Sequence, residues 1–301
     1  MAEKVHGYAK DRTQLIDDLI SELEISVTKA QEKVYRQMID KFIDKLDVKD
    51  GKIQNTRKNI RLLTTVDAVF NNFQASEGIT MLNTVIESVN TIINFNNTYF
   101  SNLGGEAFNI KKIEPEVRAK MNEWLGIEKG AVKQNGYLDK IIKDTSIRNQ
   151  VKNLAVKNII TQSGFFETKK QLSELINGID KTKQGALQKY YRNFVYDTYS
   201  ISDRIVGLEY ANSMGYEFAI YEGGSIETSR LFCRERNGKV FHKSEIEKFS
   251  PPTAKPPNYN PFIDLGGYGC RHHLNWISTK LAKFLGKKVE MFISLQNRKT
   301  A

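Results

Sequence analysis

The residues best suited to metal chemistry are concentrated in one stretch of the chain, residues 230–276. This stretch holds both cysteines, Cys233 and Cys270, and three of the four histidines, His242, His272 and His273. Two cysteines with two histidines form a common ligand set for a tetrahedral structural zinc ion. Residues two apart on an extended segment point to the same side, so Cys270 and His272 can serve one site. We therefore predict a zinc site of Cys233, His242, Cys270 and His272, with His273 as the alternative to His272.

Two other interpretations of the same residues stay open. The two cysteines are far apart in sequence and neither belongs to a Cys-x-x-Cys pair, so small buried thiols and histidines that hydrogen-bond locally are one alternative. A disulfide is the other, although a reducing compartment disfavours it. Every interpretation brings the cysteines together, and a sulfur separation above about 10 Å would exclude both a shared zinc ion and a disulfide.

The local sequence predicts how this stretch folds. Asn237-Gly238 is typical of a type I′ turn and predicts a β-hairpin between residues 230–236 and 239–241. Ser244 and Glu247 have the spacing of a capping box at the start of a short helix. Prolines between residues 251 and 261 exclude a helix there. A last helix is predicted from apolar residues at helical spacing, Leu274, Ile277, Leu281 and Phe284.

The rest of the chain is predicted to be mostly helical. Apolar residues recur every three or four positions, for example at Leu15, Leu19 and Leu23, whereas residues 216–221 alternate as a strand does. These patterns predict a mainly α fold with a small C-terminal α+β module, on which long helices pack. We divide the sequence into a helical bundle-like region at 1–105, a basic helical middle region at 106–214 and the α+β module at 215–301.

The positive charge is distributed unevenly. The net charge is +10, and two segments hold the excess: residues 129–192 have 13 basic and 5 acidic residues, and residues 265–301 have 7 and 1. Such segments suit double-stranded DNA or an acidic protein surface, although a solvated lysine-rich helical face has the same composition. The candidate contact residues near the C-terminal end are Lys280, Lys283, Lys287 and Lys288.

Two motifs resemble a known family. Cys233–Phe241, of the form C-x-x-x-x-G-K-V-F, and Gly266–Leu274, which contains G-Y-G-C-R-H-H-L, are similar to the C-terminal signature of the Mu F-like minor head proteins of tailed bacteriophages. The family's ending is of the His-Pro-Asn-Cys-Arg-Cys type. Here Gly267-Tyr268 replaces His-Pro and His272 replaces the last cysteine, which preserves a metal ligand but not a disulfide.

The resemblance implies a low-copy virion protein of the phage head. It would act inside the head near the portal, in head assembly, DNA packaging or DNA delivery, after assembly in the host cytoplasm. Its partners would be the portal, other head proteins and packaged DNA. No apolar run long enough for a membrane span and no apolar signal core at the N-terminus are present, so we expect no membrane association.

The alternative function is a virion-carried enzyme or toxin-like effector, such as a metal-dependent nuclease. His272-His273 together with Glu222, Glu227 or Glu235 would then supply acid–base groups. The sequence contains no His-Glu-x-x-His motif, phosphate-binding loop or nucleophile elbow. We therefore expect a binding protein rather than an enzyme.

Overall fold

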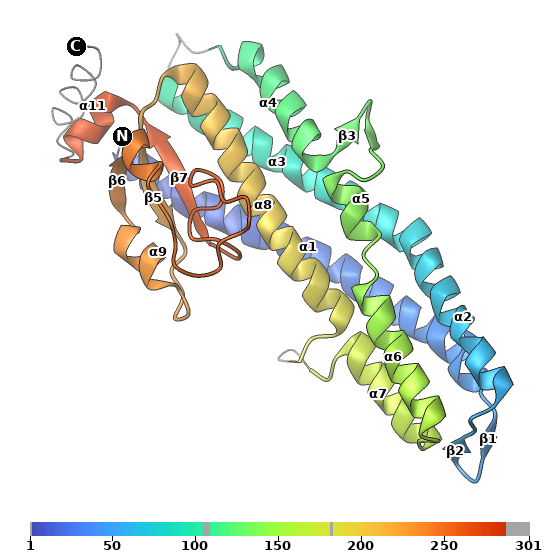
Figure 1. Ribbon diagram of the computed structural model, residues 1–301. Coiled ribbons are helices and arrows are strands. Elements are labelled where there is room, and N and C mark those ends of the chain that lie inside the picture. Colours follow the sequence, from blue (N-terminus) through green and yellow to red (C-terminus); the bar gives the residue numbers. More distant parts are fainter. Residues whose placement is uncertain (1, 105–108, 181–182, 287–301) are drawn as a thin grey trace. The chain divides into compact units, whose positions relative to one another are not determined.

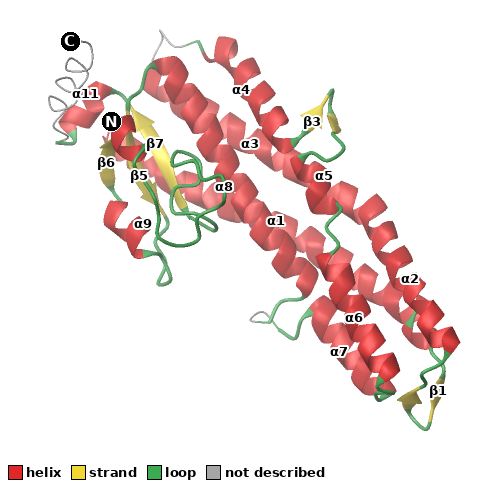
Figure 2. Cartoon of the chain, viewed as in Figure 1, coloured by secondary structure: helices red, strands yellow, loops and turns green. Residues whose placement is uncertain are grey.

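A computed structural model describes residues 2–104, 109–180 and 183–286 (Figure 1). Of the residues that the structure describes, 66% are helical, and a three-stranded antiparallel sheet forms near the C-terminal end (Figure 2). The prediction of a mainly α fold with a small C-terminal α+β module is confirmed.

The chain forms two compact units, each built from separate segments of sequence. Unit 1 comprises Met1–Leu19, Glu87–Trp124 and Tyr196–Ala301, and unit 2 comprises Ile20–Ile86 and Leu125–Val195. The predicted boundaries after residues 105 and 214 both fall within unit 1, so the compact units do not follow that division. The physical reason is that helices α1, Ala2–Lys41, α3, Ile79–Gly104, and α8, Ala186–Met214, each contribute residues to both units.

Unit 2 is built mainly from helices with two short hairpins. After α1 come a 3-10 turn η1 (Ile43–Lys45), strands β1 (Val48–Lys49) and β2 (Lys52–Ile53), helix α2 (Arg57–Phe73) and a π-helical turn η2 (Gln74–Gly78). Helix α4 (Ile110–Leu125) leads from unit 1 into strands β3 (Ile127–Glu128) and β4 (Ala131–Val132) and helices α5 (Tyr137–Ile142), α6 (Ser146–Ile160) and α7 (Phe165–Asn177). Helix α2 packs on α6, and α6 packs on α7.

Gly78 lies inside a continuous run of helix and does not end it. The π-helical turn η2 carries the backbone from α2 into α3 without a break. A Cβ atom at Gly78 would lie 2.1 Å from Cδ1 of Ile142 in α5. The glycine therefore allows a close approach of α5, and its role is packing rather than helix termination.

Unit 1 contains the sheet, in the order β6-β5-β7. Its strands are β5 (Phe218–Gly223), β6 (Lys239–His242) and β7 (His272–Ile277), and its short helices are α9 (Leu231–Arg236), α10 (Lys243–Ile246) and α11 (Thr279–Phe284). Cross-strand pairs run from Phe218 opposite Ile277 to Gly223 opposite His272. Strand β7 is buried along its whole length.

Three local predictions in this stretch are wrong. Residues 231–236 form helix α9 rather than the first strand of a hairpin, and β6 pairs with β5 instead. Asn237 has φ −58° and ψ 131° before Gly238 at φ +76°, values of a type II turn rather than type I′. The capping box of α10 is formed by His242 and Glu245, two residues before the predicted Ser244 and Glu247.

The predicted last helix is also shorter than expected. Leu274 and Ile277 belong to β7, whereas Leu281 and Phe284 belong to helix α11. Among the candidate contact residues, Lys280 and Lys283 are exposed on α11, while Leu281 and Ala282 are buried beneath them. Lys287 and Lys288 lie outside the described residues.

A buried polar network joins four elements of unit 1. Arg12 of α1 lies 3.1 Å from Asp203 of α8, which also accepts a 2.8 Å hydrogen bond from Asn96 of α3. His273 of β7 lies 2.8 Å from the other Asp203 oxygen, and Arg12 also donates to Asn275. Burial would raise the pKa of Asp203, but Arg12, His273 and Asn96 hold it below its usual range. Asp203 is therefore a buried carboxylate stabilised by its partners.

Replacement of Asp203 by asparagine should destabilise unit 1 by about 3 kcal/mol, because it leaves the buried Arg12 guanidinium without a counter-charge. Both tryptophans, Trp124 and Trp276, belong to unit 1, so denaturant unfolding followed by tryptophan fluorescence reports on it. Glu116→Gln is the control, since that exposed carboxylate lies 3.7 Å from Lys120 within one helix and should contribute less than about 0.5 kcal/mol. Equal stability of the two variants would contradict this role of Asp203.

Candidate metal site

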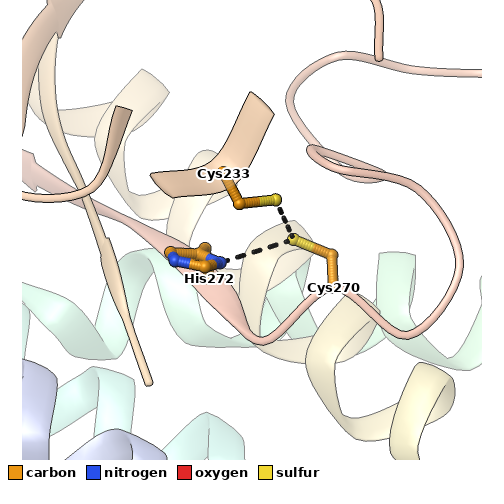
Figure 3. Close-up of side chains that lie close together, drawn as sticks. All are labelled: Cys233, Cys270 and His272. Carbon is orange, nitrogen blue, oxygen red and sulfur yellow. Dashed lines mark hydrogen bonds between the residues drawn. The ribbon is translucent and has the colours of Figure 1, made fainter. Parts of the chain in front are cut away.

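Three side chains with metal-ligand atoms converge in unit 1 (Figure 3). Cys233 comes from α9, Cys270 from the loop before β7, and His272 from the first residue of β7. Their ligand atoms all lie within 4.8 Å of one another, and all three residues are buried. The cysteine sulfurs are 3.9 Å apart, which confirms the prediction that the two cysteines come together.

Helix α9 places Cys233 by burying one side. Phe232 packs edge-on against Phe249 at 5.8 Å, with the Arg236 guanidinium 3.7 Å over its ring. Only Phe232 and Cys233 of this six-residue helix are buried. The contacts of Phe232 thus turn the neighbouring sulfur of Cys233 inward.

Two arginines hold the loop that carries Cys270. Arg204 of α8 donates to the carbonyl oxygens of His272, at 3.0 Å, and of Ile263, at 2.9 Å, and also to that of Cys270. Arg230 donates to Gly266 O at 3.1 Å and to Tyr268 O at 2.6 Å. These charge-assisted bonds satisfy carbonyl groups of the loop and of the first residue of β7.

Gly266 allows this loop to approach both sulfurs. A Cβ atom at Gly266 would lie 2.3 Å from Sγ of Cys233 and 3.0 Å from Sγ of Cys270. No side chain fits there without moving the sulfurs. The glycine is therefore required by the site itself.

The two cysteines are not equivalent. The hydrogen bond that they share, with burial, raises the pKa of Cys233 above its usual range. The same hydrogen bond, assisted by His272 and by the positive charge of Arg204, lowers the pKa of Cys270 well below its usual range. The hydroxyl of Tyr221 lies 3.4 Å from Sγ of Cys233 and 3.7 Å from Sγ of Cys270. The cluster therefore stabilises a thiolate at Cys270, the form that binds metals.

Two of the three distances between the ligand atoms fit a tetrahedral zinc ion. Tetrahedral bonds of about 2.3 Å to sulfur and about 2.05 Å to nitrogen put two thiolates about 3.8 Å apart, and a thiolate and an imidazole nitrogen about 3.6 Å apart. The sulfurs are 3.9 Å apart, and Sγ of Cys270 is 3.8 Å from Nδ1 of His272. The cluster could therefore hold a metal ion with little movement of its side chains.

His242 is not part of the cluster, and its inclusion in the predicted site is wrong. Paired residues of adjacent strands share a face of the sheet, and His242 is paired with Phe218, whereas His272 is paired with Gly223 at the other end of β5. Because Phe218 and Gly223 are five residues apart on a strand, the two histidines lie on opposite faces. His242 instead caps α10, accepting the amide of Ser244 at 3.2 Å.

His273 is not a ligand in this cluster either. It follows His272 directly on β7, so it points to the opposite face, where its Nδ1 lies 2.8 Å from Asp203. Glu222, its cross-strand partner, accepts a 3.0 Å hydrogen bond from Asn275. The pair proposed for acid–base chemistry is thus divided between the cluster and the buried polar network.

Comparison with known proteins adds no relative: no family model, no curated protein and no solved structure matches the chain. Among the residues that the structure describes, no helix is long and apolar enough to cross a membrane.

Gly266→Ala should push the sulfurs apart and expose them, which raises the rate at which Ellman's reagent modifies the cysteines and destabilises unit 1 by about 1–3 kcal/mol. Gly207→Ala is the matched control, because a Cβ there comes no closer than 3.7 Å to a neighbour and alanine favours the helix. Thiol reactivity that rises equally in both variants, or in neither, would contradict the role assigned to Gly266.

Proposed function

We propose that the cluster of Cys233, Cys270 and His272 binds one zinc ion that stabilises the α+β module. The spacing of the ligand atoms supports this, and so does the thiolate favoured at Cys270. The three ligands come from three separate segments, α9, the loop and β7. A shared ion would therefore cross-link segments that otherwise meet through a few side chains.

Elemental analysis of protein purified without added metal should find about one zinc per chain, and removal by a chelator should lower the thermal midpoint of unit 1. His272→Gln should lose the zinc. His242→Gln and His273→Gln should both retain it, because neither side chain is in the cluster. Zinc lost equally from all three variants, or absent from the unsubstituted protein, would contradict the proposal.

We further propose that the protein is a low-copy minor head protein of a tailed bacteriophage, which acts inside the head near the portal through binding. The observation that carries this proposal is the assembly of the two resembling motifs into one unit. Cys233 of the first motif lies 3.9 Å from Cys270 of the second, and Arg230, just before the first, donates to Gly266 and Tyr268 of the second. The residues that carry the resemblance thus contact one another within one folded module.

The distribution of charge supports binding to packaged DNA or to an acidic portal surface. Unit 2 carries 23 basic and 15 acidic residues, whereas unit 1 carries 22 and 20. Part of the basic surplus forms ion pairs within unit 2, since Arg148 and Lys152 of α6 lie 3.7 and 2.8 Å from Asp67 of α2. Lys280 and Lys283 on α11 are exposed, as is Phe284, whereas Leu281 and Ala282 of that helix are buried.

Replacing Lys280, Lys283, Lys287 and Lys288 with glutamine should weaken binding to duplex DNA or to the portal without unfolding the module. Six phosphate contacts would give a slope of log affinity against log salt of roughly −5, and each lost contact should reduce it by about 0.9. The double variant Lys280→Gln/Lys283→Gln is compared with Lys111→Gln/Lys112→Gln, which removes two exposed charges from α4 of the same unit.

Binding to neither partner at low salt, or equal binding by both double variants, would contradict the proposed contact surface.

The assignment to a phage head is tested by a separate measurement on purified phage particles. Mass spectrometry of purified particles should find the protein at a copy number far below that of the major capsid protein, and its absence from particles would contradict the assignment.

A further inference from the structure

A solvent-open pocket of about 170 Å³ ends at the metal cluster. Cys233, Cys270 and His272 all line it, although the cysteines are each 3% exposed and the histidine is 1% exposed. The ligand residues therefore form the floor of the pocket. Arg230, Arg271 and Thr228 are among the residues of its walls.

The described residues supply three ligands to this centre and not four. The group of clustered metal-ligand side chains is Cys233, Cys270 and His272, and the two remaining histidines of the stretch lie on the other face of the sheet. Tyr221 lies near both sulfurs, but its hydroxyl donates a hydrogen bond to Sγ of Cys233 at 3.4 Å, so we assign it as a donor to a ligand sulfur and not as a ligand. Three protein ligands with an open position are typical of zinc sites that accept an exchangeable ligand.

The chemistry of the pocket selects an anion. Arg230 and Arg271 line it, and no carboxylate is among its described lining residues. Arg271 also pairs through one terminal nitrogen with Asp17 at 2.8 Å, which leaves its Nε free of that pair. Nε2 of His272 and Nε of Arg271 are buried, with no hydrogen-bond partner in the described part of the chain. Buried donors without acceptors favour a ligand that brings acceptor atoms.

We propose that the metal bound by Cys233, Cys270 and His272 keeps its fourth coordination position open to this pocket, where it binds water or, in exchange, a small anion held by Arg230 and Arg271. This inference rests on the proposed zinc site and adds a ligand to it. The pocket is large enough for a group of phosphate size, since a water molecule occupies about 30 Å³. A metal-bound anion would make the centre a binding site rather than a purely structural one.

The test uses the full chain loaded with Co²⁺, whose visible absorption reports the coordination of the ion, and azide as the probe anion. Azide should shift the Co²⁺ spectrum saturably while the thiolate-to-cobalt absorption keeps its intensity, which shows that both cysteines stay bound. Arg230→Gln should weaken azide binding roughly tenfold, the effect of one charged hydrogen bond. Arg234→Gln, the matched control on the exposed side of α9, should leave azide affinity unchanged.

A second variant covers the case in which Arg230→Gln disturbs the loop. Thr228→Trp places a large ring at an exposed position of the pocket wall, and it should block azide while Co²⁺ binding persists. A Co²⁺ spectrum that azide leaves unchanged would overturn the proposal, and so would azide binding that neither Thr228→Trp nor Arg230→Gln affects. Failure to bind Co²⁺ would overturn it as well. Binding to DNA or to the portal is a separate measurement, and its outcome does not bear on the metal site.

Discussion

Two adjacent residues of α8, Asp203 and Arg204, hold strand β7 and the loop before it, and the candidate site depends on them. Asp203 binds the side chain of His273, and Arg204 binds the backbone of His272 and Cys270. Both residues are almost fully buried, at 3% and 4% exposure. Buried charges are stable only when they have partners. The bonds that Asp203 and Arg204 make to β7 and to the preceding loop therefore fix where β7 begins and where its first side chains point.

The alternation of a β-strand then separates two kinds of chemistry along β7. His272 points toward the cysteines, and His273 points toward Arg12 and Asp203. The same side-chain type is a candidate metal ligand on one face and belongs to the buried polar network on the other, where burial lowers the pKa of His273 against the opposing effect of Asp203. The open pocket that the two cysteines and His272 line lies on the cysteine side.

Much of this arrangement could be predicted from the sequence, and the misses have identifiable causes. Helical periodicity predicted the long helices, and extended spacing predicted that Cys270 and His272 share a face. Six residues are too few to show a period, so α9 was missed, and His242 was misplaced because strand register decides its face. Arg204 and Gly266 were not singled out. A charged helical residue and one glycine in a glycine-rich loop have no distinguishing pattern until tertiary contacts form.

The central claim is a metal centre with two sulfur ligands, one histidine and one exchangeable position. X-ray absorption spectroscopy at the zinc edge of the purified protein tests it most directly. The account predicts two sulfur atoms at about 2.3 Å and two lighter atoms at about 2.0–2.1 Å, of which a single one shows the outer-shell scattering of imidazole. Two imidazoles, or a shell without sulfur, would contradict the account.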